Sequence, residues 1–160
     1  MEKDFDAWNT KKKQTHHADT SVLFYEREVW WTHVGVNVGV EIDGRHELFL
    51  RPVVIVRKFN KNMALVVPTT AKDKDGKYYF AVSGEDKKRY ITCVSQLKNI
   101  SAKRLYRKIG TISVRDYQGL VEHLSRMIKG EFKNDDAASC DAASRRPKPI
   151  ITGKYSKRRI

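Results

Sequence analysis

Two apolar runs, residues 52–56 and 65–68, constrain the fold of this chain more than any other feature. The polar segment 60–62 separates them, and short runs of β-branched residues around such a turn are typical of a β-hairpin. Arg51 enters the first run and Thr70 ends the second, and residues at opposite sequence ends of a hairpin become cross-strand neighbours. We therefore expect Arg51 and Thr70 at one end of this hairpin, where a cation beside a hydroxyl suits an anionic group such as phosphate.

Short aromatic and β-branched segments, which are typical of strands, recur through the rest of the chain. They are residues 28–34, 78–82, 90–97 and 106–112, with a short helical turn expected at 101–104. Ser113 precedes apolar residues at helical spacing and predicts a closing helix that ends near Gly130. The order predicts a mainly β fold (β plus α), a small, strongly bent antiparallel sheet or partly open β-barrel with a C-terminal α-helix.

Two further features of the sequence indicate binding surfaces. Trp30 and Trp31 are adjacent in the first predicted strand, so their side chains must face opposite sides of the sheet. Core packing explains at least one of them, and the other is either core or a stacking surface for a base or a partner. Residues 39–47 belong to a long loop with two glycines and mixed charges, and loops that join rigid strands often carry binding residues.

Composition divides the chain into three parts. Residues 24–131 hold the predicted strands and the closing helix, and form the expected domain. Residues 1–23 are polar apart from a few apolar side chains such as Phe5 and Trp8, and predict either a short helix whose aromatic side docks on the domain or a loose arm. Residues 132–160 form a basic tail that we expect to be largely disordered; both a role in retaining nucleic acid and a merely solubilising role remain open.

The formal net charge of +13 over 160 residues favours a polyanionic partner. A basic surface attracts phosphate through counterion release and long-range steering. No stretch approaches the roughly 20 apolar residues of a spanning helix, so nucleic acid is the expected partner and a membrane is not. The N-terminal residues lack the layout of a secretory signal, and we expect a cytoplasmic protein.

The sequence suggests neither metal nor nucleophilic catalysis. His16 and His17 have no third ligand nearby, and we interpret them as exposed loop histidines. Cys93 lies in a strand-like run and Cys140 in the polar tail, so we expect no disulfide between them. We therefore predict no metal and no cofactor, and a site built from arginine, threonine, glutamine and backbone groups.

A series of motifs along the chain is similar in order and spacing to one known family. The motifs are residues 29–31, the loop with Glu41 and Asp43, residues 51–56, 66–70 and 95–100, then 104–105 and 109–110. Together they resemble the MazF/PemK family of type II toxins, from about residue 26 to residue 128. The resemblance implies an SH3-like barrel, a homodimer, a metal-independent endoribonuclease that cleaves single-stranded RNA at short motifs, and a cognate antitoxin protein as partner.

The resemblance also implies roles for individual residues. Arg51 matches the family's catalytic arginine and Thr70 its catalytic threonine, whereas Thr69 replaces a commonly aliphatic residue and receives no role. The expected RNA-binding residues are Glu41, Asp43, His46, Ser95 and Gln96. His46 is also a candidate to assist proton removal, because histidine titrates near neutrality; an exposed loop histidine is the alternative.

The expected chemistry agrees with these assignments. Attack of a ribose 2′-OH on the adjacent phosphate builds negative charge, which a guanidinium and a hydroxyl donor would stabilise. The expected products carry a 2′,3′-cyclic phosphate and a 5′-OH. The chain departs from the family pattern at residues 26–28 and at Ser95, which replaces an acid. The rival hypothesis is a non-catalytic module of the same fold that binds DNA, RNA or protein, as in gyrase-inhibiting toxins, or a regulatory binder.

Overall fold

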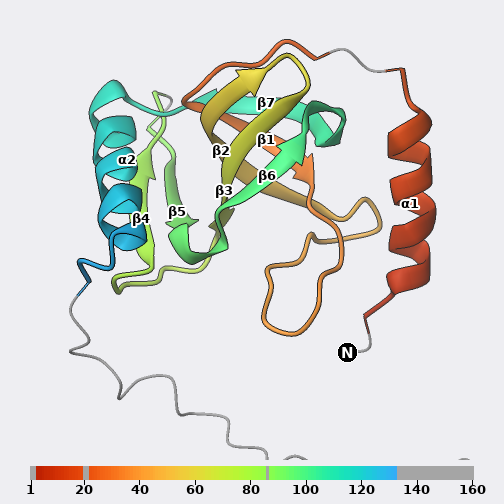
Figure 1. The fold of residues 1–160 in the computed structure, drawn as a ribbon, viewed down its shortest axis with the longest axis horizontal. Coiled ribbons are helices and arrows are strands. Elements are labelled where there is room, and N and C mark those ends of the chain that lie inside the picture. The colour runs from red at the N-terminus through yellow and green to blue at the C-terminus, as the bar shows by residue number, and fades with distance from the viewer. Residues whose placement is uncertain (1–2, 20–21, 86, 133–160) are drawn as a thin grey trace, which may run out of the picture.

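The computed structural model describes residues 3–19, 22–85 and 87–132. Its elements, labelled in Figure 1, follow the chain in this order: α1 (Phe5–His17), β1 (Glu28–His33), β2 (Leu50–Asn60), β3 (Met63–Thr70), β4 (Tyr79–Ser83), β5 (Arg89–Cys93), the 3₁₀ turn η1 (Val94–Gln96), β6 (Lys98–Ser101), the 3₁₀ turn η2 (Ala102–Arg104), β7 (Leu105–Thr111) and α2 (Val114–Ile128). The tail expected at residues 132–160 lies, apart from its first residue, outside the described residues.

The strands form one antiparallel sheet in the order β4-β5-β3-β2-β1-β7. One edge of β3 is shared, because its first half pairs with β6 and its last two residues pair with β5. The outermost strands β4 and β7 do not pair along their length, but the chain beyond β4 meets the chain beyond β7 at an isolated bridge between Gly84 and Ile112. The sheet therefore bends into a barrel that stays partly open, and the predicted mainly β fold with a closing helix is confirmed.

The predicted hairpin is β2 and β3. Val53 pairs with Pro68 and Val54 with Val67, so the same register continued to the strand ends brings Arg51 opposite Thr70. The turn forms where the sequence predicts it, and the Asn60 side chain accepts a hydrogen bond of 2.8 Å from the backbone N–H of Asn62.

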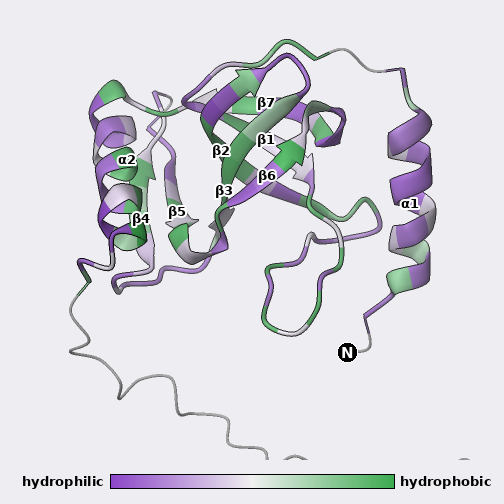
Figure 2. Ribbon diagram, viewed as in Figure 1, coloured by the Kyte–Doolittle hydropathy of each residue, from purple (hydrophilic) through white to green (hydrophobic). Residues whose placement is uncertain are grey.

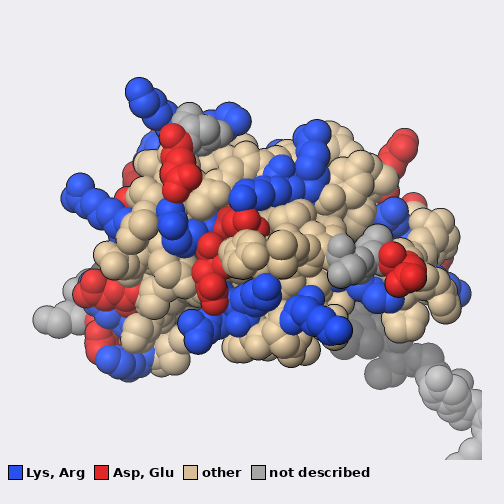
Figure 3. All heavy atoms as spheres, turned by 90° about the horizontal axis from the view of Figure 1, so that it is seen from above, with Lys and Arg blue, Asp and Glu red and all other residues tan. Residues whose placement is uncertain are grey.

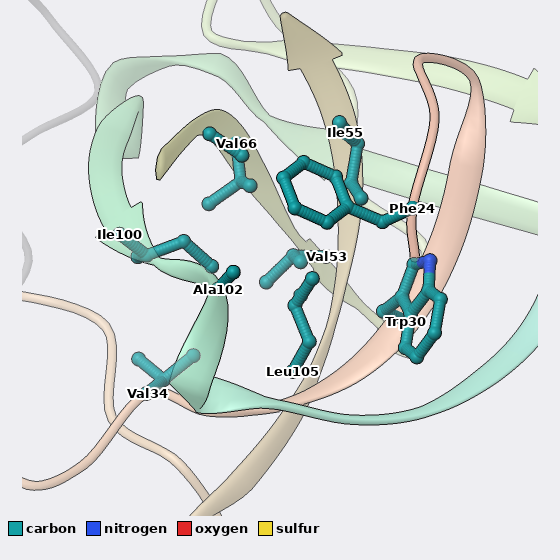
Figure 4. Packing of buried hydrophobic residues seen from close by; sticks show 10 residues of the cluster. Phe24, Trp30, Val34, Val53, Ile55, Val66, Ile100, Ala102 and Leu105 are labelled. Atoms are coloured by element: carbon teal, nitrogen blue, oxygen red, sulfur yellow. The ribbon is translucent and has the colours of Figure 1, made fainter. Parts of the chain in front are cut away.

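Both faces of the central part of the hairpin are buried, and each contributes to its own apolar cluster. Val53 and Ile55 of β2 point into the first cluster, where Phe24 and Trp30 pack against them (Figure 4). Val54 and Val56 point into the second, which α2 covers with Leu120 and Leu124. Alternation along a strand explains this division. Each fully buried side chain of this size contributes about 1.5–3 kcal/mol.

The closing helix α2 begins and ends as predicted. The Ser113 hydroxyl accepts a hydrogen bond of 3.0 Å from the N–H of Asp116, which caps the first turn. The chain leaves the helix at Gly130, whose φ of +71° is the left-handed conformation that favours glycine.

The predicted strand at residues 90–97 is wrong in its second half. β5 ends at Cys93, η1 follows, and β6 is a separate strand that the sequence pattern did not indicate. The reason is the shared edge of β3. The chain pairs first, as β5, with the last residues of β3 and then, as β6, with the first residues of β3, so it must turn between the two.

Of the two alternatives for the N-terminal region, the helix is present. The Asp4 carboxylate caps α1 by accepting a 2.8 Å hydrogen bond from Ala7 N–H. The helix is largely hydrophilic (Figure 2) and docks through Trp8, which is 5% exposed, while Phe5 is 48% exposed. In Figure 1, α1 and α2 stand at opposite sides of the sheet. In the described parts of the chain, no helix combines the length and apolarity needed to cross a membrane.

Candidate functional site

A hollow of about 280 Å³ lies where β2 begins and β3 ends, beside the loop 35–49. We call it the Arg51 pocket. Its lining residues are Val40, Ile42, Arg45, Arg51, Thr70, Lys72, Lys74, Tyr79, Cys93, Ser95 and Gln96. Lysine and arginine side chains with acidic ones among them are spread over the face in Figure 3, so cations alone do not mark a site. The pocket is distinguished by its walls, which carry cations, hydroxyls and an amide and no carboxylate.

Arg51 is held by backbone oxygens. Its Nε–H donates to the carbonyl oxygen of Asp43, and its Nη1 donates to the carbonyl of Thr69 at 3.0 Å. No carboxylate of the described residues forms an ion pair with it, and its other N–H groups have no hydrogen-bond partner there. Burial, and then the nearby Arg45 cation, lower the pKa of the Arg51 guanidinium. The result is an oriented cation whose free donors are available to an anionic ligand.

The two threonines at the end of β3 have different surroundings. The Thr70 hydroxyl accepts a 3.2 Å hydrogen bond from Lys72 N–H, which leaves its own proton free to donate into the pocket. Thr69 is 3% exposed and donates to the carbonyl of Pro52 at 3.1 Å. Thr70 is thus a candidate ligand contact, and Thr69 holds the two strands together.

Ser95 and Gln96 reach the pocket from η1, the turn that replaces the predicted end of the strand. The side-chain oxygen of Gln96 accepts a 3.1 Å hydrogen bond from Ile42 N–H. This bond ties the loop to the pocket wall and leaves the NH₂ group of Gln96 without a partner among the residues described. An amide with two free donors suits recognition of a base edge.

The loop 35–49 is folded tightly on itself. Gly44 N–H donates to the carbonyl of Gly35 at 2.7 Å, and a Cβ on Gly44 would lie 1.9 Å from the Phe49 carbonyl oxygen. Glycine is therefore required at position 44. The Asp43 carboxylate also serves the loop, because it accepts a 2.7 Å bond from Asn37 N–H and pairs with Lys3 at 2.9 Å. Asp43, one of the predicted RNA-binding residues, therefore contacts Arg51 only through the Asp43 carbonyl oxygen.

Glu41 and His46 do not line the Arg51 pocket. Glu41 faces a hollow between the loop and α1. His46, with a φ of +58°, lines a separate hollow of about 650 Å³ together with Trp31 and Tyr106. The structure therefore brings together Arg51, Thr70, Ser95 and Gln96, and separates Glu41 and His46 from them.

Trp31 also lines a further hollow, which Arg51 borders as well. This hollow of about 240 Å³ shares Arg45, Arg51 and Thr70 with the Arg51 pocket, so these side chains form a common wall. Trp30 is buried in the first cluster, and the expectation that the two tryptophans face opposite sides is confirmed. An aromatic ring beside the common wall is suited to stacking against a base.

Several pocket residues were not among the predicted site residues. Lys72 and Lys74 follow Thr70 closely in the sequence, and two lysines so near a predicted catalytic residue could have been predicted to line its pocket. Lys74 donates to the Tyr79 hydroxyl at 3.2 Å, and Tyr79 pairs with Cys93 across β4 and β5. No local pattern marks these last two, because only the pairing of β4 with β5 brings them to the pocket. Burial raises the pKa of the Cys93 thiol.

These features define a class of small, partly open β-barrels with a pocket lined by cations and hydroxyls at one end of the central hairpin. A family model described as PemK-like, MazF-like toxin of type II toxin-antitoxin system matches residues 25–128. The chain therefore belongs to this toxin family, as its motifs indicated. Among solved structures, a Mycobacterium tuberculosis toxin, MazF-mt6, is similar at 15% identity, over 64% of this chain and 97% of that chain, with a TM-score of 0.48. A search of curated proteins found no match.

Proposed function

We propose that this toxin is an endoribonuclease that cleaves single-stranded RNA, with Arg51 and Thr70 as its catalytic residues. The observation that carries the proposal is the set of unused N–H donors on Arg51 beside a free hydroxyl proton, in a pocket without carboxylates. A phosphodiester is the anionic group in RNA that matches these donors in charge and geometry.

The proposed reaction is an internal transfer within the RNA. The ribose 2′-OH gives its proton to water as its oxygen forms a bond to the adjacent phosphorus. The bond from phosphorus to the 5′-oxygen breaks and that oxygen takes a proton from water, which gives a 2′,3′-cyclic phosphate and a 5′-OH. Negative charge accumulates on the non-bridging oxygens as the new bond forms. Donation from the Arg51 guanidinium and the Thr70 hydroxyl would stabilise that charge most in the transition state.

Arg51 acts in this proposal as a charge stabiliser rather than as a base. Burial lowers its pKa, but the pKa of arginine starts so far above neutral that the guanidinium stays protonated at neutral pH. No histidine or carboxylate lines the described Arg51 pocket. His46 lies in the hollow beyond Arg45, so we propose it as a contact for flanking RNA and not as a proton acceptor.

The remaining residues are proposed to recognise the RNA strand. Ser95 and the NH₂ group of Gln96 would bind a base edge, and Trp31 would stack a base next to the cleaved phosphate. Glu41 would contact the strand at the loop, and Asp43 would act by holding the loop in place. The family implies an antitoxin partner. We propose further that the toxin acts as a homodimer.

The test is incubation of the wild type and Arg51→Ala with a long single-stranded RNA in EDTA, followed by mapping of the cut ends. We expect discrete cuts with cyclic-phosphate ends from the wild type and none from the variant. Arg115→Ala, an exposed position of α2 outside the pocket, is the matched control and should cleave normally. If the folded wild type, free of antitoxin, makes no cuts but binds RNA, DNA or a protein, the protein is a non-catalytic module of the same fold.

A further inference from the structure

Helix α1 precedes the residues matched by the family, yet it packs on the loop that holds Arg51. The Trp8 ring occupies the space of a missing side chain at Gly35, where a Cβ would lie 2.2 Å from ring atom Cε2. The ring also meets Phe49 edge to face, with 5.5 Å between centroids, and the Arg104 guanidinium lies 5.3 Å from its centre. Because Gly35 and Phe49 are the two ends of the loop, Trp8 fixes both ends at once.

Lys3, just before α1, holds the middle of the same loop. Its ammonium group donates to the carbonyl oxygens of Asn37 at 2.6 Å and Gly39 at 3.2 Å. It also pairs with the Asp43 carboxylate at 2.9 Å, and both side chains are about one-third exposed, at 30% and 32%. One cation therefore connects three points of a loop that has no regular secondary structure.

Asp43 links these anchors to Arg51. Its carboxylate is held by Lys3 and by Asn37 N–H, while its carbonyl oxygen accepts the hydrogen bond from Arg51 Nε. We propose that α1 and Lys3 are positioning elements for the Arg51 guanidinium, acting through the loop 35–49 and the Asp43 carbonyl. This inference rests on the proposed function for its catalytic consequence, but the contact chain from Lys3 to Arg51 does not depend on it.

Breaking the contacts that lead from Lys3 to Arg51 should disturb the orientation of the Arg51 guanidinium and leave RNA binding largely intact. Misplacement of a catalytic group by about 1 Å can reduce a rate by about 100-fold. Removal of the Lys3 cation leaves Arg51 charged and still bonded to Thr69, so RNA would still be attracted. We expect kcat to fall by roughly 10- to 100-fold while KM changes by less than about 3-fold.

The test uses the full chain and observes Arg51 directly. The Nε–H of Arg51 gives its own signal in a ¹⁵N–¹H spectrum, and its hydrogen bond to Asp43 should slow its exchange with solvent. Lys3→Met removes the charge and keeps most of the side-chain length; Lys13→Met makes the same change at an exposed position of α1 and serves as the control. We expect faster exchange and a lower kcat in Lys3→Met and in Trp8→Ala, with neither change in Lys13→Met.

Lys3→Met keeps the proposal testable if Trp8→Ala fails to fold. Unchanged Arg51 Nε–H exchange and unchanged kcat in Lys3→Met would overturn the positioning role while the endoribonuclease assignment stands. A wild type that cleaves no RNA would instead overturn the proposed function. Faster Arg51 exchange in Lys3→Met would in that case still support control of the Arg51 geometry by Lys3.

Discussion

Arg51 and Glu28 are charged side chains on neighbouring strands of one sheet. Glu28 is buried and Arg51 is half-buried, and their surroundings differ. Glu28 is 7% exposed, and both of its carboxylate oxygens are used: Trp30 Nε1 and Tyr25 N–H donate to one, and Lys108 to the other at 2.6 Å. Arg51 uses part of its donor set on two carbonyls and turns the rest toward a hollow. A charged group whose polar atoms all have partners in the protein stabilises the fold. A charged group with N–H donors that lack protein partners is suited to binding a ligand.

The pKa shifts of the two groups agree with this difference. Burial by itself raises the pKa of Glu28, but hydrogen bonds from Lys108, Trp30 and Tyr25 outweigh it, so the pKa of this carboxyl is lowered. Burial lowers the pKa of Arg51, and its surroundings do not offset that effect. The protein therefore stabilises the charge of Glu28 and leaves that of Arg51 only partly compensated.

The sharpest test of the contrast is Arg51→Ala. We expect cleavage to fall by about 10³-fold or more, because the variant loses several donors and a single one of this kind is worth about 10²–10³. The free energy of unfolding should change by less than about 1 kcal/mol, because no ion-pair partner among the described residues stabilises the Arg51 charge that the variant loses. Single-turnover cleavage and urea unfolding measure the two quantities. A strongly destabilised variant would mean that Arg51 is structural, as Glu28 is.

Glu28→Ala should show the reverse pattern. It leaves Trp30 Nε1 and Tyr25 N–H without their acceptor, and we expect a loss of about 2–3 kcal/mol in the free energy of unfolding. The pair with Lys108 adds little, because the lysine side chain is 46% exposed. Cleavage per folded molecule should stay near that of the wild type. A large loss of rate with stability intact would mean that Glu28 serves the reaction and not the fold.

The two threonines of β3 offer the same comparison on a smaller scale. Thr70→Val removes a donor from the pocket and should reduce the cleavage rate by roughly 10- to 100-fold with little effect on stability. Thr69→Val removes the bond to Pro52 and should cost about 1 kcal/mol of stability while cleavage persists. Equal rate losses in both variants would indicate a general disturbance of the strand end.

The smallest expected effect is on the pH dependence of stability. Because the folded pKa of Glu28 is lowered, its contribution is present above the unfolded value of about 4.3 and is lost as pH falls through the folded pKa. Glu28→Gln cannot titrate, so the difference in stability between wild type and variant should shrink as pH is lowered below about 4.3. Chemical unfolding at a series of pH values measures this difference. A difference that is constant with pH would show that the carboxylate charge does not matter.

The sequence predicted the hairpin and the meeting of Arg51 with Thr70 because both residues lie at the end of the hairpin far from its turn. It did not predict the two register shifts between the turn and the pair of Val53 with Pro68, which set the final register of the strand ends. It did not predict β6, since the division of β3's edge between two strands leaves no local pattern. It also missed the Asp43 carbonyl as the partner of Arg51, because every residue carries a backbone carbonyl and only the folded loop selects one. Tyr79 and Cys93 were missed because they reach the pocket through pairing over a distance in the chain.

The contact between Trp8 and Gly35 has a consequence for the evolution of this toxin. An indole ring stands where any larger residue at position 35 would place its Cβ, and the backbone there has a φ of +93°. A side chain at 35 would displace the helix, and loss of the indole would leave a void against the loop. Substitutions at the two positions should therefore occur together among relatives, and an α1 without an aromatic residue at position 8 should accompany a differently folded loop.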